Sequence, residues 1–156
     1  MNTYYGLIET IKETFELDSR VSTIVTGDSS DLDTYKKNIY PLVHVNVTDS
    51  PFIGLETTAV TRYTVEITVV DIRDVNKEIV NEKFWLNDNR HDVWNETMSI
   101  LKTATNILVK DVNQTGINIS ESGSAQILSF HKENTLDGWQ QTWTLDVPDT
   151  YTKVCC

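Results

Sequence analysis

Three histidines are the residues of this sequence whose side chains are best suited to proton transfer near neutral pH. His44 lies on the polar side of a strand-like stretch, His91 in the first turn of a helix-like stretch, and His131 at the end of another strand-like stretch. None has a second His or Cys at a spacing typical of zinc or iron ligands, so we expect surface or edge histidines. The alternative is a small enzyme or ligand-binding domain that pairs one of them with a carboxylate.

An acidic segment resembles part of a calcium-binding loop. Asp28, Asp31 and Asp33 bring three carboxylates together, but the Gly at the sixth position and the Glu at the twelfth position of such a loop are missing. A solvated loop and a weak surface ion site are the two interpretations of the carboxylates. The length of the loop over 26–38 also makes Asp28, Asp31 and Asp33 candidate interface residues. The sequence also lacks glycine-rich phosphate-binding loops and the Gly-x-Ser-x-Gly turn of hydrolases. It therefore predicts no cofactor and no enzymatic activity.

The two cysteines of the sequence, Cys155 and Cys156, are adjacent at its C-terminal end. Vicinal cysteines rarely bond to each other, so we expect an intracellular chain without an internal disulfide. A catalytic thiol needs a fixed electropositive pocket, and chain ends are usually mobile. An inert end, a thiol pair, a metal clip and a tail that docks on a neighbouring subunit are the interpretations.

Apolar side chains in a loop region indicate contact with another protein. Phe52, Ile53 and Leu55 lie together with Pro51 and Gly54 between two predicted strands. Exposed apolar groups in a loop are costly unless they are covered. Either another chain covers them or the loop folds back over the sheet, and both interpretations stay open.

Four tryptophans offer flat surfaces for bases or sugars, but no basic residues are interleaved with them. They are Trp85, Trp94, Trp139 and Trp143. We expect them to pack in the core or at an interface. The formal net charge of -10 also opposes nucleic-acid binding, because an acidic surface repels phosphate. No apolar run approaches the ~18 residues of a membrane span, so we expect no membrane partner.

Hydrophobic periodicity predicts the elements that must position these residues. Apolar residues at three- and four-residue steps indicate a helix over 4–15 and a longer one over about 89–112. Residues 21–26 form a short β-rich stretch, and residues 133–138 read as a hairpin turn. Alternating apolar and polar residues predict strands at 43–47, 63–69, 125–131 and 139–147.

These elements predict an α+β fold, in which an antiparallel β-sheet carries two helices packed on one face. The predicted order is helix, strand pair, long helix, strand pair. We expect one domain over residues 1–156, with mobile loops near 26–38 and 71–87 and a flexible C-terminal tail.

Several stretches, in a consistent order over nearly the whole chain, resemble structural proteins of tailed bacteriophages. They are Asp33-Thr34-Tyr35-Lys36-Lys37-Asn38-Ile39-Tyr40-Pro41-Leu42-Val43-His44-Val45, Val69-Val70-Asp71-Ile72, Asn87-Asp88-Asn89 with Asp92-Val93-Trp94-Asn95, Leu136-Asp137-Gly138-Trp139 and the Cys-ending tail. None of these stretches is a chemical signature, and their combination carries the resemblance. The family is that of the tail-completion or tail-terminator proteins.

The resemblance implies a structural virion protein that forms a homo-oligomeric ring at the tail end or the head-tail junction. Its partners would be further copies of itself, in six- or twelve-fold rings, and tail-tube, neck or portal proteins. DNA would pass through the lumen without specific binding, and the particle would assemble in the host cytoplasm. A neck or portal adaptor ring of a short-tailed phage is the alternative. The acidic composition leads us to expect a lumen that repels phosphate.

Overall fold

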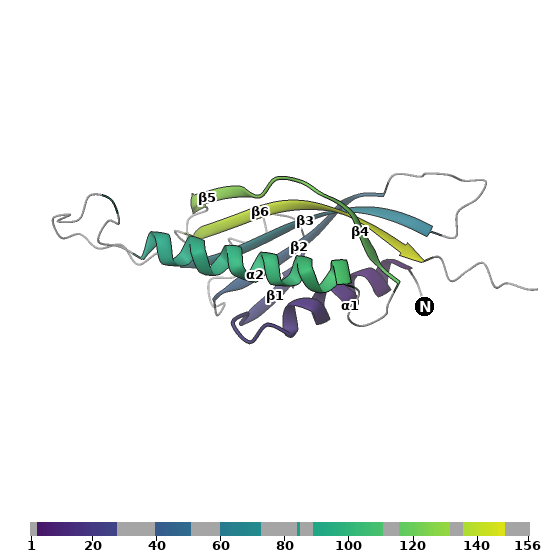
Figure 1. The fold of residues 1–156 in the computed structure, drawn as a ribbon, viewed down its shortest axis with the longest axis horizontal. Coiled ribbons are helices and arrows are strands. Elements are labelled where there is room, and N and C mark those ends of the chain that lie inside the picture. The colour runs from purple at the N-terminus through teal and green to yellow at the C-terminus, as the bar shows by residue number, and fades with distance from the viewer. Residues whose placement is uncertain are drawn as a thin grey trace, which may run out of the picture.

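Two helices and six strands make up the described part of the chain (Figure 1). The computed structural model describes residues 3–27, 40–50, 60–72, 84, 89–110, 116–131 and 136–148. In chain order the elements are α1 (Thr3–Glu16), β1 (Thr23–Thr26), β2 (Leu42–Asp49), β3 (Val60–Ile72), α2 (Arg90–Lys110), β4 (Asn118–Ser122), β5 (Gln126–His131) and β6 (Leu136–Pro148). The predicted α+β class is confirmed.

The strands form one sheet in the order β1-β2-β3-β6-β4, and β5 also pairs with β6. Only the β1–β2 pairing is parallel among the described strand pairs. β4 lies beside the C-terminal part of β6, where Asn118 is opposite Asp146, and β5 lies beside its N-terminal part, where Ile127 is opposite Trp139. β4 and β5 therefore act together as one interrupted edge of the sheet.

α1 packs on the sheet through residues one turn apart. Leu7, Ile11 and Phe15 are fully or almost fully buried, as their spacing predicts. The Phe15 ring stacks on Trp143 of β6, with ring centroids 5.9 Å apart and planes 1° from parallel. Tyr4 differs from the prediction, because it is 44% exposed and meets Tyr63 only edge-on. The central turns of α1 thus carry its contact with the sheet.

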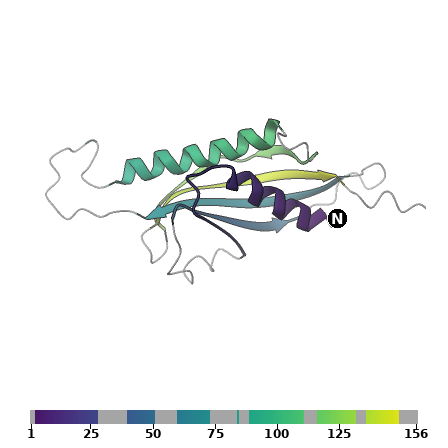
Figure 2. The ribbon, with the colours of Figure 1, turned by 90° about the horizontal axis from the view of Figure 1, so that it is seen from below.

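α2 is the longer helix and runs along the sheet, as Figure 2 shows. Its buried residues are Val93, Thr97, Ile100, Leu101, Ala104 and Leu108. These residues and the buried residues of α1 belong to one apolar cluster with the inward side chains of β2, β3 and β6. Asp92 in the first turn and Lys110 in the last turn complement the helix dipole. Both helices therefore lie on one face, as predicted.

A guanidinium joins the segment after α1 to α2. Arg20 donates to Asp18 from Nε at 2.9 Å and from Nη2 at 2.6 Å, and its Nη1 donates to the Ser99 hydroxyl at 2.8 Å. The hydrogen bonds from Arg20 hold the pKa of the Asp18 carboxyl below its usual value. This contact fixes α1 and α2 relative to each other at the margin of the core.

The opposite face of the sheet is polar at one end and apolar at the other. Arg62 of β3 makes a two-pronged contact with Asp146 of β6, with Nε 2.8 Å and Nη2 3.1 Å from the carboxylate oxygens. At the other end of the sheet, Leu42, Val70 and Leu136 form a second, smaller buried cluster. The two faces therefore differ along the same strands, as the twofold side-chain period allows.

The structure corrects one predicted boundary and adds one strand. β6 begins at Leu136, so the last three residues of the predicted turn at 133–138 are strand residues, and 132–135 lie outside the described part. Gly138 resembles a turn residue in sequence, but here the β3 backbone comes so close that a Cβ would meet the Val69 carbonyl oxygen. β4 is a strand that the sequence pattern does not predict, because almost all of its side chains are polar and exposed.

Both segments predicted as mobile loops begin with residues that belong to strands. Thr26 belongs to β1, and Asp71 and Ile72 belong to β3. Phe84 is the one residue of 73–88 within the described part, and it is 73% exposed. In the described part of the chain, no helix combines the length and the apolar composition needed to cross a membrane.

Candidate interaction site

Most side chains that the sequence singled out for contact lie outside the described residues. These are Phe52, Ile53 and Leu55 of the apolar loop, Asp28, Asp31 and Asp33 of the acidic segment, the pair Cys155 and Cys156, and Trp85. Their predicted roles therefore stay predictions.

The histidines are not brought together. His44 is fully buried on the sheet face away from the helices, opposite Thr68 of β3, which corrects the prediction of a surface position. On this face its neighbours Leu42 and Thr68 are buried as well, at the end of the sheet where the second apolar cluster forms. His91 lies in the first turn of α2, 5.6 Å from the Trp94 ring, on the other side of the sheet. His131 ends β5.

Two aspartates face each other at the end of the sheet near the start of α2. Asp71 of β3 is opposite Asp137 of β6, and Asp137 is fully buried. Burial raises the pKa of the Asp71 carboxyl, and the charge of Glu96 adds to this effect. Among the described residues, no three His, Cys, Asp or Glu side chains are grouped to hold a metal ion. Sequence reasoning missed this pair because only the strand register brings the two residues together.

We expect Asp71→Asn to raise the free energy of unfolding at neutral pH. Folding raises the pKa of the Asp71 carboxyl above its ordinary value of 3.8. The carboxyl therefore lowers the stability of the fold as pH rises from 3.8 through the pKa of the folded state. The amide keeps an oxygen for the Ile72 N–H, which Asp71 Oδ1 accepts at 2.8 Å. Urea unfolding at pH 3 and pH 7 should show a gain at pH 7 that vanishes at pH 3. An equal gain at both values would contradict a titration effect.

Two indole rings tie the first half of α2 to the edge of the sheet. Trp94 of α2 donates from Nε1 to the Leu128 carbonyl of β5 at 2.9 Å. Trp139 of β6 donates from Nε1 to the Trp94 carbonyl, also at 2.9 Å. The sequence predicts the tryptophans in the core or at an interface. Trp143 is fully buried, whereas Trp94 and Trp139 are half-buried. The indoles hold α2 against β5 at one end of the edge.

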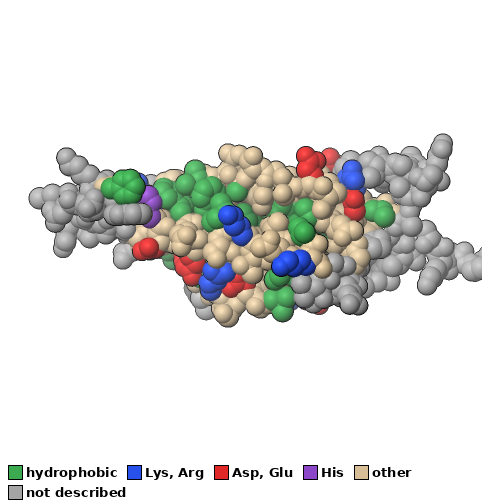
Figure 3. All heavy atoms as spheres, in the orientation of Figure 1, with side chains coloured by type: hydrophobic (Ala, Val, Ile, Leu, Met, Phe, Trp, Pro, Cys, Tyr) green, Lys and Arg blue, Asp and Glu red, His purple; other side chains and the backbone are tan. Residues whose placement is uncertain are grey.

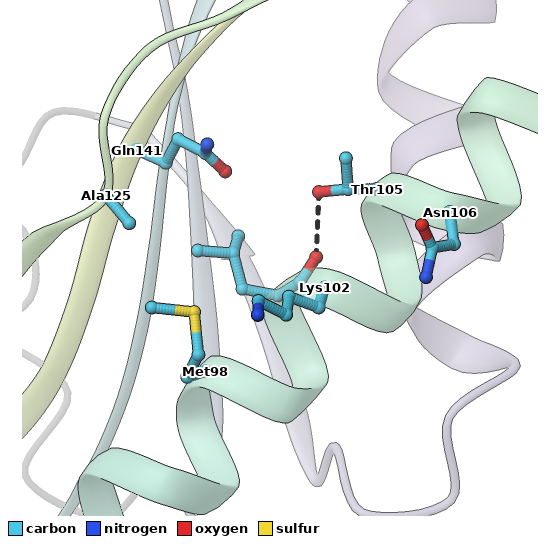
Figure 4. A pocket seen from close by; sticks show the side chains of 7 residues that line it. Met98, Lys102, Thr105, Asn106, Ala125 and Gln141 are labelled. Atoms are coloured by element: carbon cyan, nitrogen blue, oxygen red, sulfur yellow. Dashed lines mark hydrogen bonds between the residues drawn. The ribbon is translucent and has the colours of Figure 1, made fainter.

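Beyond this contact, a groove opens between α2 and the connection from β4 to β5, with a volume of about 450 Å³ (Figure 4). We call it the α2 groove. Its lining residues are Met98, Leu101, Lys102, Thr105, Asn106, Ala125 and Gln141. Leu101 is buried and forms the floor, whereas Lys102 and Asn106 are exposed. The groove therefore combines an apolar floor with a cation and an amide.

The wall of the α2 groove on the sheet side is held in place. Gln141 donates from Nε2 to the Gly123 carbonyl at 2.6 Å and accepts from the Trp143 indole at 2.9 Å. The Gly123 N–H donates to the Thr142 carbonyl at 2.8 Å, so the connection stays hydrogen-bonded to β6. The groove is thus a preformed feature of the sheet edge.

The second half of α2 is basic in a chain of net charge -10. From Thr97 to Lys110 the helix carries Lys102 and Lys110 and no acidic residue. Val109, which follows Lys102 by two helical turns and precedes Lys110 in sequence, is 62% exposed. Figure 3 shows Lys and Arg side chains over the course of α2, with apolar side chains nearby. This part of the surface combines positive charge with apolar area.

The outward side of α1 has the opposite character. Tyr5 in the first turns of α1 is 65% exposed, and Leu17, the residue after the helix, is 58% exposed. Glu9 and Glu13, also exposed, lie between them at four-residue steps. We call these four residues the α1 stripe. In Figure 1, α1 and β1 lie along one flank of the molecule and β5 along the other, so the α1 stripe and the groove side of α2 are separate surfaces.

The sequence matches no protein-family model, and it matches no curated protein. The family resemblance therefore rests on the residues quoted for it.

Proposed function

We propose that this chain is a structural subunit of a tailed-bacteriophage virion, which forms a ring around the DNA channel at the tail end or the head-tail junction. The observation that carries this proposal is the presence of two different surfaces for protein contact. One is acidic with apolar ends, on α1, and the other is basic with an apolar floor, along α2.

Different surfaces on one subunit favour head-to-tail contacts rather than twofold pairing. A twofold dimer uses the same patch on both subunits, whereas a head-to-tail contact uses two patches and closes into a ring when the rotation allows. Exposed large apolar side chains on both surfaces give each patch a reason to be covered. This arrangement supports a ring-forming subunit.

The tail location is supported by the sequence resemblance and by agreement in fold class. The resemblance implies an antiparallel sheet backed by helices, and the chain has a mostly antiparallel sheet with both helices on one face. The net charge of -10 suits a channel that DNA passes without being held.

Light scattering coupled to size-exclusion chromatography, followed by negative-stain electron microscopy, tests the proposal. We expect the full chain at high concentration to form closed rings of six or twelve copies with an open centre. A chain that stays monomeric at every concentration, or that stops at a compact twofold dimer, would overturn the ring. The copy number separates a terminator-like ring from a twelve-fold neck ring.

A further inference from the structure

We propose that the α1 stripe of one copy docks along the basic half of α2 in the next copy, with an apolar side chain inserted into the α2 groove. The inference rests on the proposed ring and names the contact that builds it. The partner is thus a second copy of this chain, bound head to tail.

Charge complementarity selects this partner. Lys102 and Lys110 make no ion pair within the described part of the chain, and neither do Glu9 and Glu13. By contrast, the other two charges of outer α1, Lys12 and Glu16, face each other at 3.7 Å. Two acidic copies with net charge -10 repel each other over most of their surfaces. They approach at least cost where the acidic stripe of one meets the basic helix of the other.

Shape and length agree with the charges. From Tyr5 to Leu17 the α1 stripe covers twelve residue steps, about 18 Å along a helix, and α2 has 21 residues, about 31 Å. An amphipathic helix that lies in a groove anchors through residues on one face, spaced three or four apart. Tyr5 and Leu17 provide an apolar anchor at each end of the stripe, and Leu101 provides the apolar floor of the groove.

The position of the groove makes the contact repeatable. α1 lies on one side of α2, with which it shares the core, and the groove opens on the other side, toward β4 and β5. A subunit that receives α1 of one neighbour in its groove still presents its own α1 stripe to the next. The contact therefore propagates in one direction, as a ring requires.

Charge reversal on each side tests the contact. One variant carries Lys102→Glu and Lys110→Glu, and the other carries Glu9→Lys and Glu13→Lys. All four positions are exposed, so both variants should fold, and circular dichroism checks this. Sedimentation velocity of the full chain should show self-association at least about tenfold weaker for each variant alone. An equimolar mixture of the two variants should assemble again, because each reversed surface then meets its reversed partner.

The two variants control for overall repulsion. We call the variant that loses Lys102 and Lys110 the lysine variant, and the one that loses Glu9 and Glu13 the glutamate variant. Each substitution changes the net charge by two, so the lysine variant goes from -10 to -14 and the glutamate variant from -10 to -6. Weaker overall repulsion alone would strengthen association of the glutamate variant, whereas the proposed contact requires it to weaken.

Three results would overturn the contact. If both variants form rings as tightly as the unmodified chain, or if only the lysine variant weakens, the ring is built through another surface and the proposed function stands. If the mixture fails to assemble, the two surfaces are not partners. If the unmodified chain does not self-associate, the contact and the proposed ring fail together.

Discussion

Replacing Gly138 with Ala is expected to lower the free energy of unfolding by more than about 3 kcal/mol. Gly138 lies in β6 between β3 and β5, opposite Val70 and Leu128. A Cβ here would meet the Val69 carbonyl oxygen and come within 2.9 Å of the Val70 Cα. Both obstacles are backbone atoms of the central strand, so relief requires β3 and β6 to separate. Urea unfolding followed by circular dichroism measures the loss.

Gly123→Ala is the matched control. Gly123 lies in the connection from β4 to β5, where a Cβ would meet the Thr142 carbonyl oxygen at 3.4 Å and the Thr142 Cβ at 3.9 Å. These are ordinary contacts, so we expect a change within about 0.5 kcal/mol. If the Gly138 and Gly123 variants were equally stable, the close approach of β3 to β6 would be refuted.

Trp143→Ala is expected to cost about 3–5 kcal/mol of the free energy of unfolding. Trp143 has no exposed surface, and its ring stacks on Phe15 of α1. Removing it leaves a cavity between α1 and β6 that the neighbouring side chains fill only in part. It also removes the hydrogen bond that the Trp143 indole donates to Gln141 Oε1 at 2.9 Å. Loss of the near-ultraviolet circular dichroism signal should accompany the change in the unfolding midpoint.

Ile127→Ala serves for comparison, because Ile127 is half-exposed at the sheet edge. It should lower stability by less than about 1 kcal/mol. A Trp143→Ala variant as stable as the Ile127→Ala variant would contradict the placement of Trp143 at the centre of the core. Trp143→Phe should recover part of the loss, since it keeps an aromatic ring against Phe15.

The core and the candidate contact surface are linked through β6. Trp143 and Gln141 lie on the same side of the strand, two residues apart, and the hydrogen bond between them orients the amide that lines the α2 groove. The same amide holds the Gly123 carbonyl of the connection from β4 to β5. A change in the core at Trp143 is therefore expected to reach the groove through one side chain.

The sequence by itself determined the features that depend on local periodicity. The steps of three and four from Leu7 to Phe15 and from Val93 to Leu108 place apolar residues on one side of a helix, and these sides are buried. The alternation from Tyr63 to Val69 likewise predicts β3 and its inward face. Composition alone gives the net charge. Each of these follows from residues close together in the chain, so no tertiary information is needed.

Only the tertiary structure decided which distant residues meet. The alternation of His44 with valines predicts an exposed side chain, but the end of the outer sheet face where His44 lies is buried, together with Leu42 and Thr68. Gly138 reads as a turn because the sequence does not show the β3 backbone beside it. The pair Asp71 and Asp137 depends on the β3–β6 register.

The candidate contact site also has a part that the sequence predicts and a part that only the tertiary structure decides. The acidic outer side of α1 can be read from its helical spacing, and so can the two lysines of α2. The α2 groove cannot be read from the sequence in this way. One wall of the groove comes from α2, and the other comes from Ala125 and Gln141, which the pairing of β5 with β6 brings together. Local patterns fix which way a side chain faces on its own element, whereas a groove exists only after two elements have packed at a particular distance.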